Sequence, residues 1–78
     1  MISQQEIWGI LESNLKTDDW TPLEQIYTLI EAQARSVQGE QPLRWKRNVR
    51  NVLQRRKSGG EVEWNGRGSY RLARRDRR

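Results

Sequence analysis

Side chains with the chemistry to recognise nucleic acid bases gather between residues 46 and 57. Arginine can donate two hydrogen bonds to O6 and N7 of guanine, and an asparagine or glutamine amide can pair in the same way with N6 and N7 of adenine. These types occur at Arg47, Arg50, Asn51 and Gln54. Lys46 and Lys57 flank them and suit phosphate, where charge matters more than position. The segment could therefore both read bases and hold a backbone.

Catalytic and metal chemistry find little support in the same sequence. The chain has no cysteine and no histidine, which excludes disulfides, the usual zinc ligands and a nucleophile paired with either residue type. Asp18 and Asp19 are adjacent but provide too few fixed oxygens for a metal ion. The run from Gly66 to Gly68 lacks the Lys-Ser/Thr pair of a phosphate-binding loop. We therefore expect no enzymatic activity, no metal and no cofactor.

The charge of the chain is strongly divided along its length. Residues 1 to 43 carry two basic and seven acidic side chains, a net charge of −5, whereas residues 44 to 78 carry 13 basic and three acidic ones, a net charge of +10. Such asymmetry indicates that the C-terminal half meets a polyanion. The end of the chain, with Arg74 and Arg75, has no apolar residue, and we expect residues 74–78 to be a disordered basic tail that follows phosphates.

Length and composition predict one small domain, residues 1–73. The chain has 78 residues and a mean hydropathy of −1.08, so folding depends on a few large side chains. The tryptophans and tyrosines must supply that bulk, at positions 8, 20, 27, 45, 64 and 70. No apolar run approaches the ~20 residues of a membrane span, and the first residues lack the pattern of a signal peptide. We expect a soluble, cytoplasmic protein.

Two helices are predicted in the acidic half. Ser3 and Glu6 form a capping-box pattern, which predicts a helix from Gln4 with an apolar stripe ending near Leu15. Thr21, Pro22 and Glu24 repeat this start signal, with proline at the first helical position. The second helix should then run to about Val37 on an apolar spacing of three and four, with Gly39 following its end.

A third helix is predicted from about Leu43 to Lys57, and its two faces differ in chemistry. At 100° per residue, one arc is apolar and holds Trp45, Val49, Val52 and Leu53. The opposite arc holds the cations and amides named above. We expect Trp45 to belong to the core rather than to stack on a base.

After Gly60 the apolar period changes to two, which predicts a β-hairpin over residues 61–73. Val62 and Trp64 can share a face with Tyr70 and Leu72 only if the loop has an odd number of residues. A three- or five-residue loop or a bulge is therefore expected, with Arg67 near its tip. Glu63 faces Arg71 in the five-residue register, and Glu61 does so in the three-residue one.

Three helices followed by a two-stranded hairpin resemble the winged helix-turn-helix fold, an α+β arrangement. The helix WKRNVRNVLQ and the strand GRGSYRL are similar to the small winged-helix domains that accompany restriction endonucleases, including the N-terminal domain of methyl-directed restriction enzymes. The similarity covers about residues 22–73. No nuclease domain is present in this sequence, so restriction activity is not implied.

The resemblance implies that the third helix enters the major groove of duplex DNA and that the hairpin, the wing of the family, touches the backbone or minor groove. The helix would present Arg44, Lys46, Arg47, Arg50, Asn51, Gln54 and Lys57. The wing would contribute Arg67 and Arg71. Two alternatives stay open at this point: docking of a protein partner on the acidic half, and binding of structured RNA through the same cations.

Overall fold

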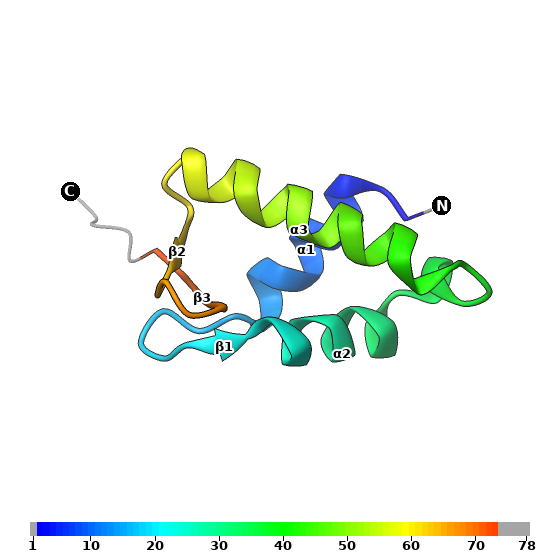
Figure 1. The fold of residues 1–78 in the computed structure, drawn as a ribbon, viewed down its shortest axis with the longest axis horizontal. Coiled ribbons are helices and arrows are strands. Elements are labelled where there is room, and N and C mark those ends of the chain that lie inside the picture. The colour runs from blue at the N-terminus through cyan, green and yellow to red at the C-terminus, as the bar shows by residue number, and fades with distance from the viewer. Residues whose placement is uncertain (1, 74–78) are drawn as a thin grey trace.

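The computed structural model describes residues 2–73 and shows an α+β fold with three α-helices and a three-stranded antiparallel sheet in that range (Figure 1). The elements follow one another as α1 (Gln4–Asn14), β1 (Thr21–Pro22), α2 (Leu23–Gln33), a 3₁₀ turn (Arg35–Val37), α3 (Pro42–Ser58), β2 (Val62–Trp64) and β3 (Ser69–Leu72). Helix α3 extends along the molecule, with the hairpin of β2 and β3 near its C-terminal end. Residues 74–78, including Arg74 and Arg75, lie outside the described residues.

Helix α1 begins where the sequence predicts. The hydroxyl of Ser3 accepts a hydrogen bond from the amide of Glu6 at 3.0 Å, which satisfies one of the unpaired amides of the first turn. A capping box also includes a bond from the Ser3 amide to the Glu6 carboxylate, but here the carboxylate has another partner. Glu6 accepts instead from the hydroxyl of Ser36 at 2.9 Å, and this bond ties α1 to the turn after α2.

The predicted capping box at Thr21 is wrong. Thr21 and Pro22 form β1, in which they pair with Tyr70 and Ser69 of β3, and α2 begins at Leu23 without a side-chain cap. The amide of Leu23 donates instead to the carbonyl of Gly68 at 2.9 Å. The hairpin loop therefore caps α2, and the sheet has one strand more than the predicted two-stranded hairpin.

Helix α2 is also shorter than the apolar spacing predicts. Its α-helical hydrogen bonds end at Gln33, and a 3₁₀ turn follows over Arg35–Val37. Ala34 and Val37 are buried even so, because the tighter turn keeps them on the core side. Gly39 then reverses the chain with a φ of +84°, a conformation that favours glycine.

The hairpin adopts the five-residue register. Val62 lies opposite Leu72, Glu63 opposite Arg71, and Trp64 opposite Tyr70. The loop of residues 65–69 is held by the Asn65 side chain, whose oxygen accepts from two backbone amides, those of Arg67 and Ser69, at 2.7 and 3.1 Å. The parity argument is confirmed, and the apolar pairs share a face.

One core lies between the three helices and the sheet. The predicted inner arc of α3 is confirmed, because its four apolar residues are buried: Trp45, Val49, Val52 and Leu53. Trp45 meets Tyr27 of α2 edge to face, with ring centroids 6.0 Å apart. The expectation that all the large aromatic side chains fill the core is wrong for Trp64, which is 45% exposed, and Trp20 is only partly buried.

Candidate nucleic-acid interface

The outer arc of α3 is strongly basic. The helix carries seven arginines and lysines and no acidic residue over Pro42–Ser58, whereas α1 and α2 carry only acidic charges. Three of the cations fall in its last turn, where they face the partial negative charge of the helix C-terminus. The polar groups on this arc nevertheless differ in what holds them, and they separate into three sets.

The first set lies beside α2 and is restrained by Tyr27. A guanidinium nitrogen of Arg50 donates to the Tyr27 hydroxyl at 3.0 Å. The ammonium of Lys46 lies over the same ring, 5.0 Å from its centroid, and 5.8 Å from the Trp45 ring. One buried tyrosine thus fixes two of the predicted contact residues. Arg50 keeps further N–H donors that can reach a ligand.

Gln54 lies near Tyr70 of β3. Its side chain is near enough to the hydroxyl of the buried Tyr70 to affect the pKa of that hydroxyl. Burial raises the pKa of this hydroxyl above its ordinary value of 10.0, and the nearby Tyr27 raises it further, while the side chain of Gln54 acts in the opposite direction.

A second set, Arg55 and Arg56, faces the rest of the protein. Arg55 donates to the side chain of Gln4 on α1 at 3.0 Å. Arg56 forms an ion pair with Glu61 at 2.8 Å and lies over the ring of Trp8. Sequence reasoning did not single out these two arginines, and their contacts indicate that they hold α3 onto α1 and the hairpin.

The third set is turned to solvent. Arg44, Arg47 and Asn51 are exposed, and within residues 2–73 they have no hydrogen bond or ion pair from their side chains. Arg44 and Arg47 also line a shallow hollow at the start of α3 together with Gln41 and Leu43. These residues are the ones on α3 that a ligand meets without displacing an internal contact.

The hairpin adds one more exposed cation to this surface. Arg67 lies at the tip of the loop between two glycines with φ of +81° and +89°, Gly66 and Gly68. The bonds of Asn65 and the docking of Gly68 on α2 fix the loop that carries it. The tip position predicted for Arg67 is confirmed.

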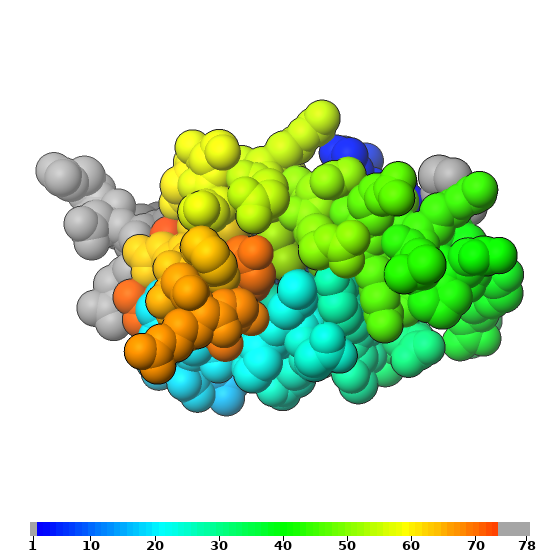
Figure 2. Space-filling view, viewed as in Figure 1, coloured from blue at the N-terminus to red at the C-terminus, as the bar shows by residue number. Residues whose placement is uncertain are grey.

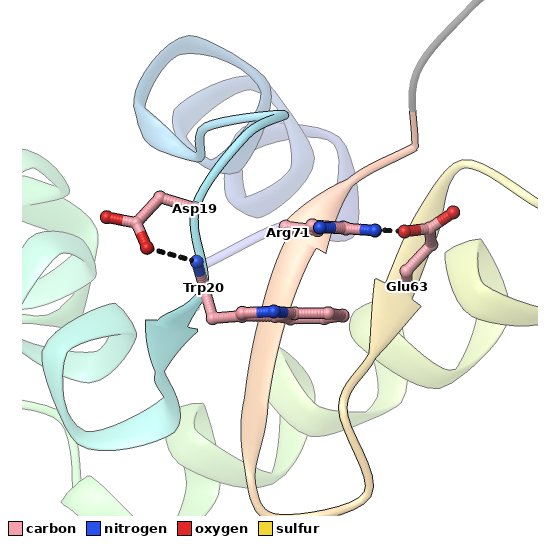
Figure 3. A network of polar contacts seen from close by, with 4 residues as sticks. All are labelled: Asp19, Trp20, Glu63 and Arg71. Carbon is pink, nitrogen blue, oxygen red and sulfur yellow. Dashed lines mark hydrogen bonds and ion pairs between the residues drawn. The ribbon is translucent and has the colours of Figure 1, made fainter.

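Arg71 behaves differently from Arg67, because its charge is already engaged. Its Nε donates to Glu63 on the neighbouring strand at 2.6 Å, and its guanidinium lies over the ring of Trp20, 4.3 Å from the centroid (Figure 3). The backbone amide of Trp20 donates in turn to the carboxylate of the preceding residue, Asp19, at 2.9 Å. The structure therefore assigns Arg71 a place in the junction between the hairpin and the loop before β1.

Helix α3 and the hairpin lie on one face of the molecule. In Figure 2 they form adjoining parts of this face, α3 in green and yellow and the hairpin in orange. Lys57 joins the two, since its ammonium lies 5.0 Å from the ring of Trp64 on β2. The described residues from the predicted set thus come from two adjoining elements, and Arg74 and Arg75 fall outside the described range.

No protein-family model, curated protein or solved structure matches this chain. None of the helices within residues 2–73 combines the length and the apolar character that crossing a membrane requires.

Proposed function

We propose that this chain is a winged-helix domain that binds duplex DNA without catalysing a reaction on it. Helix α3 enters the major groove in this proposal, and the hairpin acts as the wing against the backbone or minor groove. The short strand β1 completes the sheet behind the wing. A single α-helix fits the width of the B-form major groove.

The observation that supports this proposal best is the joining of a uniformly basic helix to a rigid hairpin on one face. All seven charges of α3 are positive, and the adjoining hairpin presents the exposed Arg67 in its loop. The two acidic residues of the hairpin, Glu61 and Glu63, form ion pairs with Arg56 and Arg71. Phosphates attract such a surface irrespective of base sequence.

The residues of α3 and the hairpin take different roles in this proposal. Arg47 and Asn51 lie four residues apart on one exposed strip and have the types that pair with guanine and adenine. Arg50 is positioned by the Tyr27 hydroxyl, so it loses less freedom when it contacts a base, and Gln54 has the type that pairs with adenine. Lys46, Lys57 and Arg67 suit phosphate.

Competition between nucleic acids tests this function. A labelled DNA duplex bound to the chain is displaced with unlabelled duplex DNA, single-stranded DNA or duplex RNA of the same sequence. We expect duplex DNA to compete best, because the deep, narrow major groove of A-form RNA does not admit a helix. Equal or better competition by duplex RNA would favour the RNA alternative, and no binding to any of them would favour a protein partner.

A further inference from the structure

Trp64 is a large aromatic side chain exposed at the junction of the hairpin and α3. It is 45% exposed, and in residues 2–73 the only other exposed large apolar side chain is Leu43. Its partner across the hairpin, Tyr70, is buried. The apolar face of the hairpin therefore extends beyond the core at Trp64, and folding alone leaves a large part of its surface in contact with water.

The surroundings of Trp64 are cationic. The ammonium of Lys57 lies 5.0 Å from the centroid of its ring, and the exposed Arg67 follows three residues later in the hairpin loop. An apolar partner would have to desolvate these charges without pairing them, at a considerable cost. The charge instead favours a partner that combines negative groups with flat, apolar surfaces, as a nucleic acid strand does.

The group that fits an indole ring in such a strand is an unpaired base. In a continuous duplex the faces of the bases are covered by their neighbours, so a side chain outside the groove meets sugar and phosphate. A base in a single-stranded overhang has a free face, and stacking on an aromatic side chain tolerates any base because every base has one. Lys57, which lies against the ring, can then neutralise an adjoining phosphate, and Arg67 supplies a second cation in the same hairpin.

We propose that Trp64 is a stacking platform for an unpaired base of a DNA strand that continues from the duplex bound by α3. The preferred ligand is then a duplex with a single-stranded overhang. This inference rests on the proposed duplex binding and extends it to the structure of the DNA.

The test compares one duplex in blunt form and with a short 5′ or 3′ thymine overhang. For the unmodified chain the better of the two overhangs should raise the affinity about 5- to 150-fold, the equivalent of stacking one base. Trp64→Ala should abolish most of this gain, whereas Trp64→Phe should retain much of it. Leu43→Ala, which removes the other exposed apolar side chain, should leave the gain unchanged.

Two further measurements keep the result interpretable. Thermal unfolding of each variant shows whether it is folded, and the comparison is made only between folded variants. The overhang should quench tryptophan fluorescence in the unmodified chain, because a stacked base quenches the indole of Trp64. In Trp64→Phe the other tryptophans still fluoresce, but the quenching by the overhang should be lost.

The possible results distinguish a failure of base stacking at Trp64 from a failure of the proposed duplex binding. Equal binding of blunt and overhang duplexes by the unmodified chain overturns the stacking platform and leaves duplex binding intact. An equal loss on both duplexes in Trp64→Ala also overturns it, because Trp64 then contacts the sugar-phosphate backbone or supports the hairpin. Binding to the single strand with no preference for a duplex overturns the proposed function instead.

Discussion

The guanidinium of Arg50 on α3 donates a hydrogen bond to the Tyr27 hydroxyl on α2 at 3.0 Å. The two residues are 23 positions apart, and the bond crosses the junction of the acidic and basic halves of the chain. It also means that a residue predicted from its type to read bases is positioned by a residue buried below it.

Tyr27→Phe should therefore weaken recognition without touching DNA. It removes the oxygen that holds Arg50 and keeps the ring that packs on Trp45, so the free energy of unfolding should fall by only about 0.5–1.5 kcal/mol. Selection from randomised duplexes gives the preferred site, and the preference for that site over a scrambled one should decrease. Arg50→Ala should lose about 1–3 kcal/mol, mainly on the preferred site. If Tyr27→Phe binds both sites like the unmodified chain, Arg50 does not depend on this bond.

Trp45 should be the most costly tryptophan to remove. It is 2% exposed and packs against Tyr27, so Trp45→Ala should cost about 3–5 kcal/mol, which is enough to unfold most of a domain this small. Urea denaturation followed by circular dichroism measures the loss, and Trp64→Ala is the matched control because its side chain is partly in solvent already. Equal stability of the two variants would contradict the burial of Trp45.

The contacts of Arg71 predict two separate contributions to the stability of the junction between the hairpin and the loop before β1. Its ion pair with Glu63 is partly solvated, with about a third or more of each side chain exposed, so it should contribute about 0.2–1 kcal/mol and weaken in salt. Stacking on Trp20 should contribute about 0.5–1 kcal/mol. Double-mutant cycles for Trp20 with Arg71 and for Glu63 with Arg71 measure both couplings. A coupling to Trp20 that disappears in salt, or is absent, would show that the ring does not hold the arginine.

The raised pKa of Tyr70 predicts a loss of stability in alkali. The folded protein holds this proton more tightly than the unfolded chain, whose tyrosine titrates near 10.0. The contribution of the protonated Tyr70 to the free energy of unfolding is therefore fully present below pH 10.0. It is lost as the pH rises through the higher pKa of the folded state. In Tyr27→Phe, where Tyr70 is the one remaining tyrosine, ultraviolet titration of the phenolate should still give a raised pKa because burial persists. Tyr70→Phe should remove this part of the pH dependence of unfolding, and an ordinary pKa for Tyr70 would contradict its burial.

The sequence predicted the elements whose signals are local and strong. The two faces of α3 follow from the period of Trp45, Val49 and Val52, and the hairpin register follows from parity. Strand β1 could not be predicted in the same way, because Thr21 and Pro22 carry a helix-start pattern. Their extended pairing depends on β3, almost 50 residues later in the chain.

The residues of the candidate site were chosen by their type, and the sequence did not show which internal contacts hold their side chains. Periodicity places Arg50 on the outer arc of α3 but does not show that its guanidinium donates to the Tyr27 hydroxyl of α2. The alternation of the hairpin also predicts on which face Trp64 lies, but not how far its side chain is buried, since the core ends before this position. Tertiary packing decides these points, and the alternation of the hairpin gave no signal for the exposure of Trp64.

The salt dependence of duplex binding tests the central claim most directly. If α3, the hairpin and the following residues neutralise about four to seven phosphates, the logarithm of the binding constant should fall against the logarithm of the salt concentration with a slope of roughly −4 to −6. Replacing Arg44 and Arg47 by glutamine should reduce that slope by about 2, roughly one for each cation. The same change at Lys16 and Arg35, which lie outside α3 and the hairpin and lower the net charge equally, should leave the slope nearly unchanged. A slope near zero, no binding at about 50 mM salt, or an equal effect of the two pairs would contradict a DNA-binding surface built on α3.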